Sequence, residues 1–343
     1  MQQKRSFLRI QILRFFAAAF VVAYHAQITI LSYYGGSKPY PLLELGVYGV
    51  DLFFVISGFI IVFIGTTKEK TAGMFLRRRI ERVVPMYFLM TLGMFALTHV
   101  PGLARNEAAS PLDLIQSLTF TTWIDGPEAY PVLNVGWTLE YEMLFYLIAT
   151  VAMAVTKRVW IGTALVMLAL VVTGRGTAFF LQNPIIIEFV FGMTIGAFLY
   201  DRRAFPWMLA ATALVMITLP ISGAAWRVWA FGLPSAGVVA LAIYLDLRRR
   251  YEGSWLPALG NASYSIYLVH VVAISFVCKV ASVVMPRLST AVAVPAISAF
   301  AILVGYLTYR LIERNLTLFF TRKRRAAVHT PAPVTALESE DAA

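Results

Sequence analysis

One segment of the chain decides its class of fold: residues 46–64 read GVYGVDLFFVISGFIIVFI, with a single charged side chain, Asp51. A transmembrane helix needs about 20 mostly apolar residues, because a helix rises about 1.5 Å per residue and the hydrocarbon core of a bilayer is about 30 Å thick. The segment has this length and this composition. It therefore predicts a helix that crosses a membrane.

Apolar runs of this kind recur along the whole chain, each bounded by charged residues, proline or glycine. Two of them, 158–173 and 206–221, are short for a crossing. Together the runs predict an all-α fold, a polytopic transmembrane helix bundle of about ten helices embedded in a lipid bilayer. The ten expected spans are residues 12–32, 46–64, 83–100, 134–155, 158–173, 178–200, 206–221, 228–246, 262–284 and 290–312.

The composition agrees with this reading. Of the 343 residues, 59% are hydrophobic and 14% charged, whereas a soluble domain has about 45–50% and about 25%. The mean hydropathy is +0.73. These values exclude a soluble enzyme, a disordered protein and a secreted disulfide scaffold. Cys278 is the single cysteine, and the sequence has no zinc-ligand spacing and no glycine-rich phosphate loop, so no metal is expected.

The net charge of +11 tests the topology. When the connections alternate from a cytoplasmic N-terminus, 21 Lys and Arg residues fall inside, while Arg14, Lys279 and Arg310 lie within spans. The five that fall outside are Lys38, Arg105, Arg175, Arg227 and Arg287. This asymmetry follows the positive-inside rule and predicts that both termini are cytoplasmic. Since most of the excess charge is topogenic, nucleic acid is not an expected partner.

The chain divides into one integral membrane unit, residues 1–325, and a tail, residues 326–343. The first apolar run is expected to be a retained helix rather than a signal peptide, because it is long and Arg14 interrupts it. The tail is rich in Ala, Pro and Thr and ends in acidic residues, so a disordered cytoplasmic segment is predicted.

Ionisable residues within spans are functional candidates, because a charge in the bilayer is costly. Arg14 and His25 are eleven residues apart, about three helical turns, so they share one face about 16 Å apart along the axis. The alternative is that Arg14 snorkels to the interface and His25 only packs within the bundle.

A carboxylate at the depth of His25 lies in residues 137–146, WTLEYEMLFY. Glu140 and Glu142 are about 200° apart on a helix and cannot face one site together. Glu142 lies at a depth similar to that of His25, so it is expected to orient that imidazole as a base. Two unrelated buried charges are the weaker alternative, because each would be unpaired.

Two further groups have both a structural and a functional reading. In residues 75–85, FLRRRIERVVP, Arg82 follows Arg79 at i,i+3 and Arg78 at i,i+4, so the three can form one cationic face. Arginine forks suit phosphate, although topogenic charge or lipid headgroup binding is the commoner use. Asp51 lies about one turn inside the outer boundary, on a helix whose Gly49 and Gly58 permit close packing.

A late segment, residues 260–270, reads GNASYSIYLVH. Ser263, Tyr267 and His270 are spaced to share one helix face. His270 is therefore a candidate second site residue, and a histidine that serves helix packing is the alternative.

Five segments, in this order along the chain, resemble the motifs of the membrane acyltransferase 3 family: residues 12–25, 49–59, 75–85, 137–146 and 263–270. The sequence is similar in particular to the exopolysaccharide acetyltransferases of succinoglycan type. The resemblance extends from about residue 10 to 314. It implies that residues 1–325 form an integral membrane acyltransferase domain in a bacterial cytoplasmic (inner) membrane.

The resemblance also implies an activity: transfer of an acetyl or other short acyl group from acyl-CoA to a hydroxyl of a cell-surface or exopolysaccharide unit, expected to be lipid-linked. His25 would then be the general base, with Glu142 as its partner and Asp51 orienting the sugar. Arginines would hold the acyl-CoA phosphates, and three residues of the later motifs would bind the acceptor. The arginines are Arg14, Arg77, Arg78, Arg79 and Arg82, and the acceptor residues are Trp137, Tyr267 and His270.

Two other classes of function fit the intramembrane charges. A polysaccharide transporter or lipid-linked-sugar flippase predicts paired halves with inverted-repeat symmetry, which the sequence does not display. A channel or scaffold predicts no dependence on acyl-CoA. Label transfer from acetyl-CoA that requires His25 distinguishes the enzyme from both.

Overall fold

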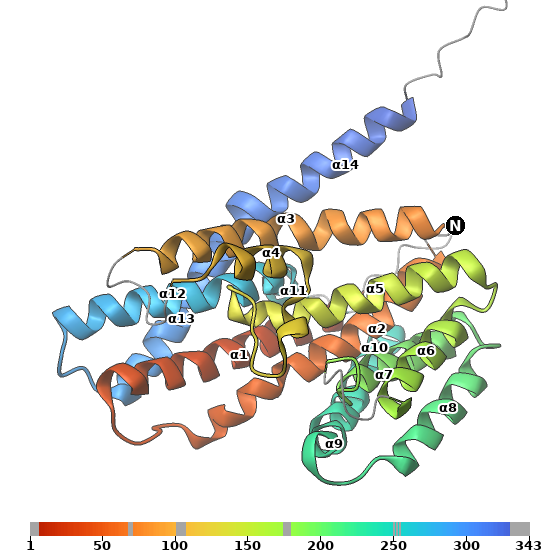
Figure 1. The fold of residues 1–343 in the computed structure, drawn as a ribbon, viewed down its shortest axis with the longest axis horizontal. Helices are drawn as coiled ribbons and strands as arrows, with labels where there is room; N and C mark the ends of the chain where they lie inside the picture. The colour runs from red at the N-terminus through yellow and green to blue at the C-terminus, as the bar shows by residue number, and fades with distance from the viewer. Residues whose placement is uncertain are drawn as a thin grey trace, which may run out of the picture.

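The computed structural model describes residues 7–67, 71–100, 108–173, 180–249, 251, 253 and 255–329, and every regular element in these ranges is helical. The all-α prediction is confirmed (Figure 1). The longer helices are α1 (Leu8–Tyr34), α2 (Gly49–Thr67), α3 (Ala72–Thr98), α5 (Trp137–Val155), α10 (Leu233–Arg248), α12 (Ser263–Val284) and α13 (Thr290–Thr308). The shorter ones are α4 (Pro111–Thr119), α6 (Val159–Thr173), α7 (Ile186–Tyr200), α8 (Phe205–Thr218), α9 (Gly223–Arg227), α11 (Trp255–Asn261) and α14 (Arg314–His329).

Short 3₁₀ and π-helical pieces join or extend these helices. The 3₁₀ pieces are η1 (Pro41–Tyr48), η2 (Thr122–Asp125) and η3 (Asn134–Gly136). The π-helical pieces are η4 (Val228–Gly232), between α9 and α10, and η5 (Tyr309–Glu313), between α13 and α14. π-Helical turns are rare and are frequently found at functional sites.

Each of the ten expected spans contains an apolar helix. Seven helical segments are long and apolar enough to cross a membrane, whereas α6, α7 and α8 have 15, 15 and 14 residues. At about 1.5 Å per residue these three are roughly 21–23 Å long, which is less than the hydrocarbon thickness of about 30 Å. The chain is a multi-pass membrane protein in which α6, α7 and α8 are shorter than a full crossing.

The interior position of α7 explains its length. Its buried residues cover all sides of the helix, from Ile186 to Ala197, and include Glu188. A helix buried all round is surrounded by protein rather than by lipid, so its length need not match the bilayer. Figure 1 shows α6, α7 and α8 grouped at one side of the bundle, with α12 and α13 at the other.

Glycines bring α7 and α2 into backbone contact. A Cβ atom at Gly58 would lie 2.0 Å from the Phe189 carbonyl oxygen, and one at Gly192 would lie 1.9 Å from the Val55 carbonyl oxygen. No larger residue fits at either position without moving a helix. The expectation that Gly58 serves close helix packing is therefore confirmed.

Replacing Gly58 with alanine is expected to destabilise the bundle by about 1–3 kcal/mol, because the added methyl group overpacks a backbone contact. Gly237→Ala is the matched control. Gly237 lies within α10 with nothing within 4 Å of an added Cβ, so alanine there should stabilise the helix by about 0.5–1 kcal/mol. Thermal unfolding of the detergent-solubilised variants measures both changes. Equal stability of the two variants would contradict the assigned contact.

Helix α1 lies against α11, α12 and α13 as well as α2. Gly260 permits one of these contacts, since a Cβ there would lie 1.9 Å from the Gln11 carbonyl oxygen. The packing turns the face of α1 that carries Arg14 and His25 toward the interior of the bundle.

The last described helix, α14, projects beyond the other helices (Figure 1). This helix runs through His329, four residues into the tail predicted from Ala326. Residues 330–343 lie outside the described residues, so disorder there stays a prediction.

Candidate active site

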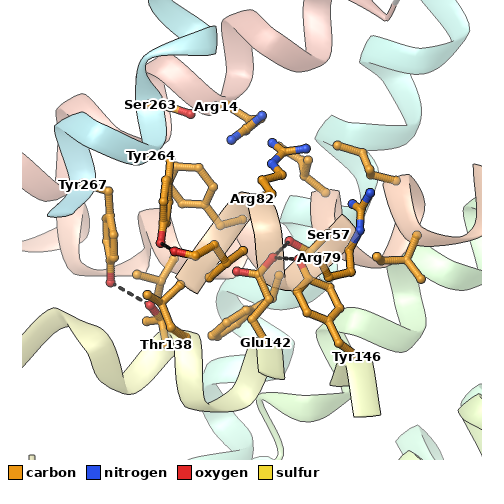
Figure 2. Close-up of a pocket in the computed structure, with 18 residues that line it drawn as sticks. Arg14, Ser57, Arg79, Arg82, Thr138, Glu142, Tyr146, Ser263, Tyr264 and Tyr267 are labelled. Atoms are coloured by element: carbon orange, nitrogen blue, oxygen red, sulfur yellow. Dashed lines mark hydrogen bonds between the residues drawn. The ribbon is translucent and has the colours of Figure 1, made fainter. Parts of the chain in front are cut away.

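A pocket enters the bundle between α1, α2, α3, α5 and α12. It encloses about 790 Å³, including its opening. Three arginines stand on one side and Tyr267 with Thr138 on the other, as Figure 2 shows. The other polar lining residues are Ser57, Glu142, Tyr146, Ser263 and Tyr264, and the apolar ones are Val50, Phe53, Phe54, Ile56, Ile60, Ile61, Val83 and Leu139.

The structure divides the predicted arginine set. Arg14 from α1 and Arg79 and Arg82 from α3 line the pocket, with Arg79 buried and Arg82 exposed. Arg77 is exposed and pairs with Glu81 at 2.8 Å. Arg77 and Arg78 are absent from the pocket lining. One helical turn of α3 therefore supplies two of the cations.

Arg14 lies deeper in the bundle than a snorkelling residue would. Its guanidinium donates to the Gln11 side-chain oxygen at 3.3 Å. The charged side chains that act on it are Arg82, Glu313 and Glu142. Two guanidinium groups near one another repel, so an anionic ligand between them would be stabilised.

Glu142 is the carboxylate of this pocket. It accepts hydrogen bonds from the hydroxyls of Ser57, at 3.2 Å, and Tyr146 (Figure 2). Ser57 comes from α2 and Tyr146 from the next turn of α5, so two helices hold the carboxylate in place. Glu140 points elsewhere and accepts from the Thr122 backbone amide at 2.9 Å. The prediction that the two glutamates face different sites is confirmed.

Tyrosines of α12 form the other side of the pocket. The Tyr264 hydroxyl donates to the Val83 carbonyl at 2.7 Å. The Tyr267 hydroxyl donates to the Val135 carbonyl at 3.2 Å and lies 3.1 Å from the Thr138 hydroxyl. Ser263 is buried, and its hydroxyl finds no hydrogen-bond partner within the described part of the chain. Hydrogen bonds therefore hold both tyrosine hydroxyls in place, whereas the Ser263 hydroxyl has no such bond to a described residue.

His25 lies one helix turn beyond the pocket, beside α12. Its Nδ1 is 3.1 Å from the Val21 carbonyl oxygen and 3.0 Å from Nε2 of His270. His270 is fully buried, and its own Nδ1 is 2.6 Å from the Tyr267 carbonyl oxygen. Because Tyr267 lines the pocket, the imidazole pair and the pocket meet at one turn of α12.

A comparison with known protein families identifies the family to which this chain belongs. The family model described as an acyltransferase domain matches residues 7–310, nearly the whole chain. The chain belongs to this acyltransferase family. It is an O-acyltransferase, as the resemblance in its motifs predicts.

A curated relative supports the assignment. The acyltransferase is 33% identical over 296 residues to the exopolysaccharide production protein ExoZ of Rhizobium meliloti (strain 1021), covering 79% of this chain and 90% of the relative. No solved structure matches.

The predicted pairing of His25 with Glu142 is wrong in this acyltransferase. The described hydrogen bonds of His25 go to α1 and α12, and those of Glu142 go to α2 and α5. The two residues have a similar expected depth, but depth does not specify which neighbouring helix a side chain faces. His270, predicted to bind the acceptor, occupies the place expected for Glu142.

Asp51 lies outside the pocket lining, so its predicted role toward the sugar stays a prediction. Asp51 is fully buried and accepts a fork from Arg227, with Nε–Oδ1 and Nη2–Oδ2 distances of 2.9 and 2.7 Å. Both carboxylate oxygens are therefore engaged by Arg227. The Arg227 guanidinium also lies over the Tyr48 ring, 5.2 Å from its centroid. Trp137 packs on Phe54 and is absent from the pocket lining, so its acceptor-binding role stays untested.

Three charged residues near these sites are not among the site residues predicted from the sequence. The alternation of connections predicts Arg227 on the outer surface, and Glu188 is the single acidic residue within the expected span 178–200. Glu188 is fully buried beside Asp51 and Arg227. Glu313, on the π-helical turn η5, accepts from the Ser265 hydroxyl at 2.5 Å near Arg14. A search for single charges within apolar runs would have found Glu188.

Proposed function

We propose that this acyltransferase moves an acetyl or another short acyl group from acyl-CoA to a hydroxyl of an exopolysaccharide unit, with His25 as the general base. The observation that carries the proposal is the pocket, which has three arginines at one side and, at the other, Tyr267, one helix turn from the His270 that contacts the proposed base. A donor with phosphates at one end and a thioester at the other matches this arrangement, with its phosphates at the arginines.

The arginines suit the phosphates of CoA. Guanidinium groups bind phosphate oxygens through paired, charge-assisted hydrogen bonds. Arg82 is exposed at the pocket, where the Glu313 carboxylate is the acidic group that acts on it. Its exposed guanidinium is accessible to a ligand at the pocket opening. Arg79 and Arg14 lie further in and would attract the same anionic group.

The remaining lining suits the thin chain that carries the thioester. Side chains of α2, among them Phe53 and Ile60, give an apolar wall, and the tyrosines of α12 give a polar one. A pantetheine chain has both characters, since it carries amide groups along an aliphatic chain. If this chain extends away from the arginines, it brings the acyl group toward Tyr267.

The proposed transfer uses the second nitrogen of His25. As the acceptor hydroxyl oxygen bonds to the thioester carbonyl carbon, its proton passes to Nε2 of His25. The carbon–sulfur bond then breaks, CoA leaves as a thiolate, and His25 returns the proton to that sulfur. A positioned base of this kind contributes about 10²–10⁴-fold in rate.

The acceptor is proposed from the relative, whose name is exopolysaccharide production protein. An exopolysaccharide unit still attached to its lipid carrier would reach the partly buried base from the bilayer side. The expected location is accordingly the inner membrane of a bacterium. A transporter or flippase is less favoured, because the family match is to an acyltransferase domain.

The proposal is tested by incubating purified protein with labelled acetyl-CoA and an exopolysaccharide acceptor. Label should appear in the polymer. Labelled acceptor carried across a vesicle membrane without acetylation would instead favour the transporter.

Arg82→Gln is expected to raise the KM for acetyl-CoA about tenfold and to change kcat little. A hydrogen bond to a charged group is worth about 1.5–3 kcal/mol, and exposure of Arg82 reduces this to roughly the 1.4 kcal/mol that makes a factor of ten. Arg77→Gln is the matched control, since Arg77 is on the same helix but outside the pocket lining. Acetyl-pantetheine lacks the CoA phosphates, so its KM should be the same in wild type and in Arg82→Gln. Equal effects on both donors would contradict phosphate binding by Arg82.

A further inference from the structure

The two imidazoles that meet between α1 and α12 form a hydrogen-bonded pair. The ring centroids of His25 and His270 are 4.9 Å apart, and the nitrogen atoms that face each other are 3.0 Å apart. At this distance one nitrogen must carry a hydrogen and the other must accept it. The backbone carbonyls around the pair determine which is which.

His270 has its hydrogen on Nδ1. That nitrogen lies 2.6 Å from the Tyr267 carbonyl oxygen, which can only accept a hydrogen bond. A neutral imidazole has one N–H and one lone pair, so Nε2 of His270 carries the lone pair. This lone pair points at His25.

The tautomer of His25 follows from its two neighbours. Its Nδ1 faces two acceptors, the Val21 carbonyl at 3.1 Å and Nε2 of His270 at 3.0 Å. Nδ1 must therefore carry the hydrogen and share it between them. Nε2 of His25 is left with the lone pair, which is the form that a general base requires.

We propose that His270 is the positioning residue of the active site: it holds His25 in the Nδ1–H tautomer and stabilises the imidazolium that forms when Nε2 takes a proton. This inference rests on the proposed function, in which His25 is the base. In serine hydrolases a buried carboxylate fills this place. Here a neutral imidazole does so, and the hydrogen bond becomes charge-assisted once His25 is protonated.

Burial explains why an imidazole is suited to this position. His270 is fully buried, and a carboxylate there would carry a charge that needs its own partner before any proton moves. Among the described hydrogen bonds of the two rings, none goes to a carboxylate. The neutral pair is thus stable at rest, and its lone pair becomes useful only when His25 gains charge.

The tautomer is measured directly by nitrogen NMR of histidine-labelled wild-type protein in nanodiscs. The chain has four histidines, and loss of a signal in His25→Gln assigns His25. The expected result is an N–H at Nδ1 of His25 and a scalar coupling across the hydrogen bond to a non-protonated Nε2 of His270. A hydrogen on Nε2 of either ring would overturn the inference. This readout needs no substrate, so it remains decisive if the proposed activity fails.

A matched pair of variants tests the catalytic consequence. His270→Gln keeps an acceptor oxygen near the position of Nε2, whereas His270→Met has a similar size and no such acceptor. We expect kcat to fall about 10²-fold in His270→Met, less than the roughly 10⁴-fold loss seen when a triad carboxylate is replaced, because Val21 still accepts from His25. The KM for acetyl-CoA should not change, and His270→Gln should recover most of the loss. Equal activity of the two variants would overturn the positioning role.

Discussion

Replacing His25 with alanine is expected to lower kcat for acyl transfer by about 10²–10⁴-fold, the contribution of a well-placed general base. The variant loses Nε2, the single imidazole nitrogen of the pair that keeps a free lone pair. The acceptor hydroxyl would then have to attack the thioester without losing its proton to the protein. Binding of acetyl-CoA should persist, because the arginines of the pocket are unchanged.

The measurement is acetylation of the polymer, by label transfer in vitro and by NMR of polysaccharide from cells that carry the variant. His99→Ala is the matched control, since His99 is exposed at the end of α3 and bonds to the Phe95 carbonyl within its own helix. Both variants should insert into the membrane in wild-type amounts. Normal polymer acetylation by His25→Ala would remove His25 from the mechanism and leave the acyltransferase assignment intact.

Replacing Arg227 with methionine is expected to destabilise the protein by about 3–5 kcal/mol, because it leaves the Asp51 carboxylate buried without its partner. Asp51 is completely shielded from solvent, and Glu188 lies beside it. Two carboxyl groups would then share an apolar interior without a cation. Arg227 is 176 residues away in sequence, so its fork also ties α2 to the α9–α10 segment.

Adding Asp51→Asn to Arg227→Met removes the unpaired buried carboxylate. The double variant should be more stable than Arg227→Met alone, because a buried amide costs less than a buried unpaired charge. Arg287→Met is the control, since Arg287 is exposed and belongs to the same predicted outer set. Thermal unfolding in detergent measures the stability of wild type, Arg227→Met, the double variant and Arg287→Met. If Arg227→Met were as stable as Arg287→Met, the ion pair would not support the fold.

Helices α1 and α5 show which parts of a site in a membrane bundle can be predicted from the sequence. The spacing of Arg14 and His25 correctly places both on the inward face of α1, and the separation of Glu140 from Glu142 correctly divides them. The prediction that His25 and Glu142 contact each other because they lie at one depth is wrong. His25 meets His270 of α12, and Glu142 meets Ser57 of α2 and Tyr146 of its own helix.

The arginine cluster shows the same limit on one helix. Spacing of three and four residues is correct as local geometry and admits Arg78 and Arg79 equally. The packing of α3 against its neighbours decides between them, since Arg79 lines the pocket and Arg78 does not. A helix that is apolar on most of its surface does not specify by itself which side faces the bundle.

The sequence by itself determined the all-α membrane class, the places of the apolar helices, the close packing at Gly58 and the family. Each of these depends on length, hydropathy, residue size or local motif, which act within one helix. Only the tertiary structure decided the His25–His270 pair, the Asp51–Arg227 fork and the arginines of the pocket. The physical reason is that hydropathy determines how deep a residue lies in a bilayer, whereas its partner depends on how helices pack side by side. Lipid is as apolar as the helix surfaces, so that packing follows from shape and hydrogen bonds rather than from a hydrophobic pattern.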